Sequence, residues 1–247
     1  MSLTPSLPSS FQLASDEVHS WCASLDVPPE TSARLYATLT PDERTRSARF
    51  RFEREQQRFI AARGVLRDLL GRYLQIQPGK ISFVYNAFGK PDLGPEFANR
   101  LKFNLSHSAG LALIAITTAS NVGVDLEYIQ AQSAHADIAQ CFFSAAEVDY
   151  LSALPGHLYA EAFFSCWTKK EAYLKACGEG LATPLNSFSV PLTTEPAPTP
   201  VELCAGWSLY TLRPAPGYAG ALAIEGTAWR LRQWQWRIPG LSCGTRP

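Results

Sequence analysis

Along the first 120 residues, the pattern of apolar positions changes between the period of a strand and the period of a helix. The sequence Thr40-Pro41-Asp42-Glu43 predicts a helix start: threonine is a good N-cap, proline fits the first helical position, and glutamate completes a capping box. The helical pattern then continues to Arg72. A shorter helix is expected over residues 32–39. Strands are expected over residues 18–25, 81–85, 101–105 and 111–117, with loops over residues 86–91 and 106–110.

The remaining residues repeat this mixture of short strands and helices. An apolar run predicts a strand over residues 122–127. A second capping box, from Ser144 to Glu147, starts a helix that Pro155 breaks. The longest predicted helix follows over residues 158–177, and Gly178 and Gly180 end it. Further strands are expected over residues 187–192, 207–212, 218–224 and 229–237.

The longest helix carries charged residues at the margin of its apolar stripe. With Phe163 set at 0°, Glu171 lies at roughly 80° and Lys175 at roughly 120°. A side chain at this margin can be held by packing and still reach a cleft, although an i,i+4 ion pair on the helix surface is the simpler interpretation. Lys170 lies at roughly 340°, inside the stripe, so it must reach water along its stem or find a partner.

This order of elements predicts an α+β protein built from two similar, pseudo-symmetric subdomains. Each is expected to be a small, mainly antiparallel sheet packed with helices, over residues 1–120 and 121–247. We expect the functional site in the cleft between them.

Composition narrows the possible partners and the cellular location. The 247 residues contain 22 Lys plus Arg and 22 Asp plus Glu, so the molecule as a whole has no general attraction for nucleic acid or an anionic membrane. The six cysteines show no C-x-x-C spacing, which favours reduced thiols over a zinc site. The chain shows neither a signal peptide nor a run of membrane length, and we expect a cytoplasmic monomer.

Positive charge is concentrated in one segment. Residues 41–72 contain nine arginines and five acidic residues, and most of these arginines are expected to form ion pairs on solvated helices. Arg46 and Arg63 are candidates for binding a phosphate, because arginine offers a bidentate fork. A nucleic-acid binder that stacks bases on Phe50 and Phe52 is an alternative, but the interleaved acids and the overall neutrality argue against it.

Two carboxylates on the strand over residues 122–127 form a candidate metal site, although an Asp-x-Glu pair in a strand is more often a solvated polar face. Asp125 and Glu127 are two residues apart, so both side chains point to one face of a strand. Hard oxygen ligands of this kind suit Mg²⁺ bound together with water and substrate phosphates. Nearby, His107 lies in a stretch rich in hydrogen-bond donors, and Gly89 allows close approach of a ligand to the backbone.

Taken together, these segments resemble the Sfp-type 4′-phosphopantetheinyl transferases. The residues that carry the resemblance are Phe103-Asn-Leu-Ser-His-Ser108, Gly123-Val-Asp-Leu-Glu127, Trp167-Thr-Lys-Lys-Glu-Ala-Tyr-Leu-Lys175 and Gly178-Glu-Gly-Leu181, with support from Phe88-Gly-Lys-Pro91. They occur in the family's order and cover most of residues 40–192. A G-V-D-x-E motif followed about forty residues later by W-x-x-K-E-A-x-x-K is highly specific.

The resemblance implies an enzyme that uses coenzyme A and Mg²⁺ to place a phosphopantetheine arm on a serine of an acyl or peptidyl carrier protein, releasing adenosine 3′,5′-bisphosphate. The implied metal ligands are Asp125, Glu127 and Glu171. Residues implied to bind coenzyme A are Ser106 and His107 at its phosphates, Lys175 at the pyrophosphate, Gly89, Lys90 and Pro91 at the adenine end, and Arg46 at the 3′-phosphate. One position departs from some relatives: Glu43 stands where they carry a basic residue, and Arg63 is the candidate to replace that charge.

The chemistry is consistent with this mechanism. Glu171 is the expected general base for the carrier serine, directly or through a metal-bound water, while Lys175, Asp125 and His107 complete the catalytic group. The alternative is a coenzyme A or carrier-protein binding module that has lost catalysis. The presence of all three carboxylates and of Lys175 argues against it.

Overall fold

The computed structural model describes residues 11–98, 100–118, 120–178, 180, 183–192, 201–203 and 206–237. After the first strand, three helices follow one another: α1 (Pro29–Ala37), α2 (Pro41–Ser47) and α3 (Glu53–Leu74). The capping box predicted for α2 is confirmed: the Glu43 N–H donates to Thr40 Oγ1, and the Thr40 N–H donates to the Glu43 carboxylate. The helical pattern predicted to run on to Arg72 divides into α2 and α3, with residues 48–52 between them.

A four-stranded sheet packs against these helices. Its order is β10 (Arg230–Gln235), β1 (Glu17–Ser24), β5 (Leu111–Thr117) and β4 (Lys102–Ser108). The pairs β1–β5 and β4–β5 are antiparallel, and β1–β10 is parallel. A separate hairpin of β2 (Phe83–Tyr85) and β3 (Pro91–Leu93) lies between the short helices η1 (Pro78–Lys80) and η2 (Pro95–Phe97).

The second sheet is antiparallel throughout. Its order is β6 (Val122–Tyr128), β9 (Tyr218–Glu225), β8 (Trp207–Leu212) and β7 (Val201–Glu202). Helices η3 (Ala131–Ser133), α4 (Ala136–Phe142), α5 (Ala145–Ser152), α6 (Gly156–Cys177) and η5 (Leu185–Ser187) accompany it. The second predicted capping box, at the start of α5, is confirmed, and Gly178 ends α6 at a positive φ of 76° as predicted.

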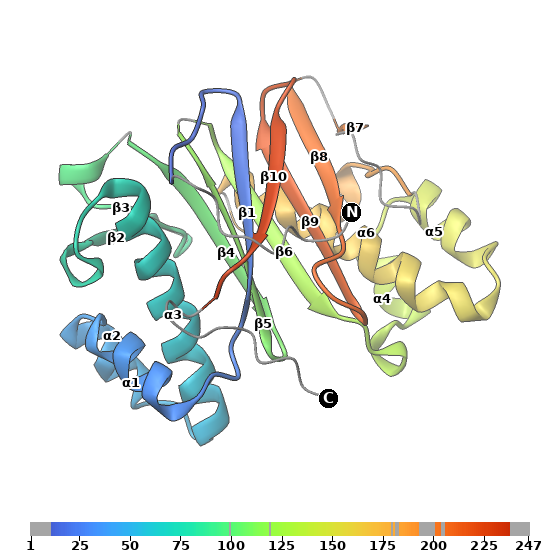
Figure 1. Cartoon of the computed structure of the whole chain (residues 1–247). Coiled ribbons are helices and arrows are strands. Elements are labelled where there is room, and N and C mark those ends of the chain that lie inside the picture. The colour runs from blue at the N-terminus through green and yellow to red at the C-terminus, as the bar shows by residue number, and fades with distance from the viewer. Residues whose placement is uncertain are drawn as a thin grey trace, which may run out of the picture.

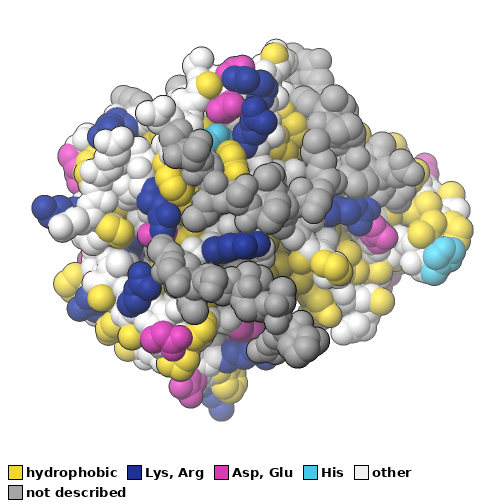
Figure 2. Space-filling model, in the orientation of Figure 1, with side chains coloured by type: hydrophobic (Ala, Val, Ile, Leu, Met, Phe, Trp, Pro, Cys, Tyr) yellow, Lys and Arg dark blue, Asp and Glu magenta, His cyan; other side chains and the backbone are white. Residues whose placement is uncertain are grey.

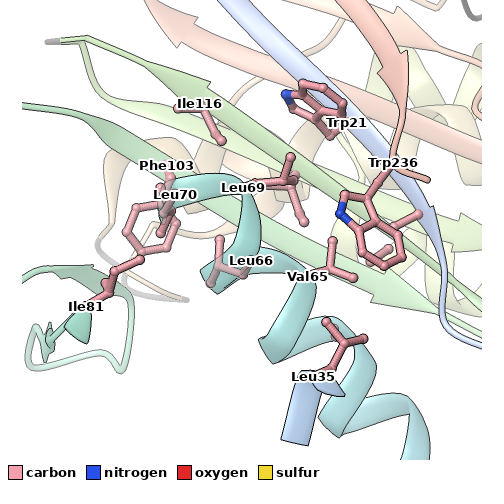
Figure 3. Packing of buried hydrophobic residues seen from close by; sticks show 14 of the residues in the cluster. Trp21, Leu35, Val65, Leu66, Leu69, Leu70, Ile81, Phe103, Ile116 and Trp236 are labelled. Carbon is pink, nitrogen blue, oxygen red and sulfur yellow. The ribbon is translucent and has the colours of Figure 1, made fainter. Parts of the chain in front are cut away.

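The two sheets face each other between two outer layers of helices (Figure 1). Alternation along β5 explains this, since Leu113 and Ala115 join a cluster between the sheets whereas Ile114 and Ile116 point toward α3. Figure 3 shows the core on the α3 side, where leucines of α3 pack against Trp21 of β1. The predicted α+β class with two helix-covered sheets is confirmed, and the pseudo-symmetry of the halves stays a prediction.

Strand β10 joins the sheet of the opposite half. Residues 229–237 were expected to add a strand to the C-terminal subdomain, and β10 instead pairs with β1 along Glu17↔Arg230 to Cys22↔Gln235. Its Trp234 stacks on Trp21 with ring centroids 5.3 Å apart. The predicted domain boundary between residues 120 and 121 stays a prediction. Strand β10, from the C-terminal part of the chain, belongs to the sheet of the N-terminal half.

Two expected elements are wrong. Residues 106–110 were expected to be a loop, but β4 continues to Ser108 and a two-residue turn with Ala109 at φ 49° completes the hairpin to β5. Residues 187–192 were expected to be a strand, but side chains of the neighbouring helices bind their backbone instead. The Val190 N–H donates to Glu147 and the Phe188 carbonyl accepts from Lys170.

Among the described cysteines, Cys22 and Cys166 are buried, Cys177 is half-buried and Cys141 is exposed. Burial raises the pKa of the Cys22 thiol to about 11. Within the described ranges, every helix is too short or too polar to cross a membrane. For residues 193–200, rich in proline and threonine, the sequence predicts a loop, and for the residues beyond 237 an irregular tail; both lie outside the described residues.

Candidate active site

The candidate site lies where the edge strands β4 and β6 run side by side. Polar side chains at every second position of β4 reach across to β6. Asn104 Oδ1 accepts the Val124 N–H at 2.9 Å, and Ser106 Oγ donates to Asp125 Oδ1 at 2.9 Å. Ser108 Oγ donates to Glu127 Oε2 at 2.8 Å. Side chains thus join the two sheets at this seam, and they hold both strand carboxylates in place.

Helix α6 packs directly against β6 because residue 123 is glycine. A Cβ there would lie 2.1 Å from the carbonyl oxygen of Ala172 and 2.3 Å from the backbone nitrogen of Ala176. Since alternate residues of a strand share a face, Asp125 and Glu127 point to the same side as this contact. The G-V-D-x-E motif and the long helix are therefore brought together as the sequence predicts.

Lys175 of α6 binds the carboxylate strand. Its Nζ lies 2.6 Å from Asp125 Oδ1 and 3.0 Å from Ser106 Oγ. The simpler interpretation of Lys175 was an i,i+4 ion pair with Glu171 on the helix surface, whereas its observed ion pair is with Asp125 of β6. A helical lysine thus reaches the seam, which requires α6 to be held at a fixed distance from β6.

The carboxylates around Lys175 influence one another. Loss of water contact raises the pKa of Glu171, and the negative charge of Asp125 raises it further. The pKa of Glu127 is also raised, first by desolvation and then by Asp125 and Glu171, against the hydrogen bond from Ser108. Asp125, Glu127 and Glu171 therefore form one cluster of negative charge that a single ammonium group only partly compensates.

The chemistry of this cluster fits a divalent cation. Asp125 is 2% exposed, and its Oδ2 is a buried oxygen without a hydrogen-bond partner among the described residues. A buried carboxylate oxygen without a hydrogen-bond partner lowers the free energy of unfolding unless a cation binds it. Within the described ranges, no three acidic, histidine or cysteine side chains are gathered closely enough to enclose a metal ion. The metal-ligand assignment therefore stays a prediction supported by the donor set.

A cavity of about 300 Å³ opens beside the carboxylates. Glu171 and Lys175 line one side, and Gly89, Lys90 and Pro91 line another. The cavity thus lies between α6 and the loop over residues 86–91, which the family resemblance places at opposite ends of coenzyme A. Other lining residues come from the loop, from β4 and from the end of α6: Phe88, Asn104, Leu105, Leu174, Gly178 and Gly180.

His107 of β4 and Arg46 of α2 are close enough for their charges to interact. The pKa of His107 is lowered, first by loss of water contact and then by the positive charges of Lys175 and Arg46. Arg46 lies with its guanidinium 5.3 Å from the ring centroid of Phe59, and it lines a surface pocket with Arg49 and Phe50. The guanidinium of Arg46 suits a phosphate group, and a neutral imidazole at His107 can still donate one hydrogen bond to it.

Two predicted coenzyme A residues have their charges occupied by protein groups. Arg63 binds Glu43 at 3.1 Å and donates to the Tyr85 hydroxyl at 2.7 Å. Lys90 Nζ donates to the carbonyl of Ala176. Other arginines of residues 41–72 also pair with carboxylates: Arg72 with Asp68 is an i,i+4 pair of the expected kind, whereas Arg58 pairs with the distant Asp26 and Arg67 forms a buried pair with Glu43.

Glu43 is explained by these pairs. It is buried between Arg63 and Arg67, where it connects α2 to α3. A basic residue at this position would meet two arginines. Glu43, at the position where some relatives carry a basic residue, therefore stabilises the contact between α2 and α3, and its carboxylate binds Arg63.

Sequence reasoning missed Asn104 and Ser108. Both hydrogen bond across the seam, and their signal was their two-residue spacing with Ser106. Placing residues 106–110 in a loop concealed this spacing, because a loop has no fixed alternation of faces.

Comparison with known proteins identifies the family of this chain. Residues 28–119 match the N-terminal domain model of 4′-phosphopantetheinyl transferases, and residues 121–223 match the 4′-phosphopantetheinyl transferase superfamily. 4′-Phosphopantetheinyl transferase HetI of Nostoc sp. is 42% identical over 231 residues, covering 93% of this chain and 96% of that protein. A putative 4′-phosphopantetheinyl transferase of Synechocystis sp. is 36% identical over 150 residues, 61% of each chain. Sfp of Bacillus subtilis is 31% identical over 163 residues, covering 66% of this chain and 70% of Sfp.

The chain therefore belongs to the 4′-phosphopantetheinyl transferase superfamily, in its two-domain Sfp-type branch. It is a transferase enzyme that activates carrier proteins, and the family uses coenzyme A. This outcome agrees with the expected partners and disfavours the alternative of a nucleic-acid binder. Figure 2 shows Lys and Arg side chains mixed with Asp and Glu over the described surface in view, as the overall neutrality predicts.

Proposed function

We propose that the cavity at the seam binds coenzyme A, and that the phosphopantetheine arm passes from it to a serine hydroxyl of a carrier protein. The observation that carries the proposal is the cluster of Asp125, Glu127 and Glu171 around Lys175, with a buried oxygen of Asp125 left without a partner. Such a site suits a pyrophosphate bound together with a divalent cation.

In this proposal, Gly89 to Pro91 contact the adenine end of coenzyme A, and Arg46 and His107 bind its 3′-phosphate. Ser106 and Lys175 lie nearer the pyrophosphate, where the ammonium stabilises negative charge. Ser106 also orients Asp125 through its hydrogen bond. Arg63, which Glu43 already binds, contributes to the local positive charge without a contact of its own.

The reaction is a displacement at the phosphorus that carries the pantetheine arm. The serine oxygen forms a new bond to this phosphorus, and the bond to the bridging oxygen breaks, so that adenosine 3′,5′-bisphosphate leaves with the bonding electrons. Glu171 accepts the serine proton. Glu171 lies on α6, where it lines the cavity together with Lys175, so its carboxylate can reach an incoming hydroxyl.

Asp125, Glu127 and Glu171 are the proposed ligands of Mg²⁺. When bound, the ion would supply charge neutralisation at the pyrophosphate. The carrier protein would approach from the open side of the cavity and present its serine to Glu171. Fatty-acid, polyketide and nonribosomal-peptide carriers all meet this description.

A transfer assay tests the proposal. Coenzyme A with a labelled arm is incubated with an apo carrier and Mg²⁺, and label on the carrier is measured for the wild type and for Glu171→Gln. We expect kcat of the variant to fall about a hundredfold or more, because a general base typically contributes that much.

Glu161→Gln is the matched control, since Glu161 lies on the same helix but is 38% exposed at an ion pair with Arg213. Full transfer by Glu171→Gln would remove Glu171 from the mechanism. Tight binding of coenzyme A by the wild type, without transfer to a carrier of any of the three kinds, would favour the binding-module alternative.

A further inference from the structure

The loop between β2 and β3 holds the end of α6 from the opposite half of the molecule. Asn86 Nδ2 donates to the Gly178 carbonyl at 2.7 Å. Lys90 Nζ donates to the Ala176 carbonyl at 3.0 Å and to the Val122 carbonyl at 3.4 Å. Residues 86–91 come from the N-terminal half, whereas these three carbonyls belong to α6, to the residue that ends it and to β6.

These contacts satisfy groups that a helix leaves open. The last carbonyls of a helix have no partner within it, and they form the negative end of its dipole. An ammonium and an amide placed there stabilise the end of α6. Desolvation lowers the pKa of Lys90 to about 8, which agrees with an ammonium that has exchanged water for backbone carbonyls.

Asn86 also fixes the shape of the loop. Its Oδ1 accepts the N–H groups of Phe88 at 3.0 Å and Lys90 at 2.9 Å. The Phe88 ring lies against Gly180, where an added Cβ would be 3.2 Å from the ring. The loop is thus held internally by the same residue that attaches it to the helix.

We propose that Lys90 and Asn86 are positioning residues that latch the loop to α6. Both sides of the cavity depend on this latch, because Gly89 to Pro91 line one side and Glu171 and Lys175 line the other. The inference rests on the proposed function, in which these two sides hold opposite ends of coenzyme A. It assigns the ammonium of Lys90 to the protein scaffold, whereas the resemblance placed this residue at the adenine end of coenzyme A.

The test compares Lys90→Met with a control variant, Lys80→Met, because Lys80 is an exposed lysine of the same half. Affinities for coenzyme A and for dephospho-coenzyme A, which lacks the 3′-phosphate, are measured by calorimetry. We expect Lys90→Met to weaken both by a similar factor of about tenfold, the loss typical of one or two buried hydrogen bonds. Asn86→Ala, which removes no charge, is expected to act in the same direction.

Amide hydrogen exchange supplies a readout that is independent of the substrate. Exchange of the Gly178 N–H, which donates to the Leu174 carbonyl, is expected to accelerate in Lys90→Met and Asn86→Ala but not in Lys80→Met. Unchanged exchange and affinity would overturn the latch. A loss confined to coenzyme A, with dephospho-coenzyme A bound normally, would make Lys90 a phosphate ligand. If the wild type failed to bind coenzyme A, the proposed function would fail while the exchange result would still test the latch.

Discussion

At the scale of single residues, a few positions set the distance between the strand and the helix of the site. Gly123 is the clearest, because its missing side chain lets the backbone of β6 touch α6. This contact brings Lys175 to 2.6 Å from Asp125. The glycine of the G-V-D-x-E motif is thus a packing residue, and the two acids after it depend on that packing.

Gly123→Ala is expected to destabilise the protein by about 1–3 kcal/mol, the usual cost of overpacking a core. The added methyl group would meet backbone atoms of α6, which cannot move aside as a flexible side chain can. Urea unfolding measures the change. Gly156→Ala is the control: it lies at the start of the same helix with nothing within 4 Å of an added Cβ. Equal stability of Gly123→Ala and the wild type would show that the close packing of β6 and α6 is not needed.

At the scale of elements, α6 is held from two sides. On one side the loop over residues 86–91 binds its end, and on the other a buried ion pair anchors it. Lys170 Nζ lies 2.8 Å from Glu147 Oε2 and also donates to the carbonyls of Leu185 and Phe188. The sequence predicts that Lys170 must reach water or find a partner, because it lies inside the apolar stripe of the helix. Its partners are the Glu147 carboxylate of α5 and two carbonyls of residues 185–190.

Lys170→Met is expected to lower the free energy of unfolding by about 3–5 kcal/mol, because it leaves the Glu147 carboxylate buried without its cation. Adding Glu147→Gln should recover part of this loss, since the uncompensated charge is then removed. Urea unfolding at neutral pH compares Lys170→Met, Glu147→Gln and the double variant with Lys80→Met. A double variant that loses the full sum of the two single effects would contradict this account of the ion pair.

The sequence predicted most elements because their signals are local. Capping boxes at Thr40 and Ser144, the glycine stop of α6 and the apolar run of β6 each depend on a few neighbouring residues. Apart from the misplaced loop over residues 106–110, the failures concern contacts between distant segments. Nothing near residues 187–192 reveals that Lys170 and Glu147 bind their backbone, and nothing near Trp234 reveals that β10 pairs with β1.

The same distinction applies to the candidate site. Motif spacing placed Asp125, Glu127, Glu171 and Lys175 in one group, and the structure brings their elements together. Two further contacts could not be predicted: Arg63 binds Glu43, and Lys90 binds the end of α6. In each case the partner belongs to another element of the fold. Charge alone marks a residue as a candidate for phosphate binding, and only its neighbours decide whether that charge is already used.

At the scale of the whole molecule, the site exists only where the halves meet. Strand β4 and the loop over residues 86–91 come from the first half, and β6 and α6 come from the second. Strand β10 then returns from the second half to the first sheet. These crossings hold together a cavity that neither half encloses alone.

The central claim is that Asp125, Glu127 and Glu171 bind a single divalent ion at this junction. Titration with Mn²⁺ in the presence of coenzyme A, followed by electron paramagnetic resonance, counts the bound ions directly. We predict one Mn²⁺ per chain in the wild type and in Glu161→Gln, and binding at least about tenfold weaker in Asp125→Asn and Glu171→Gln. Wild-type Mn²⁺ binding by both of those variants would contradict the claim.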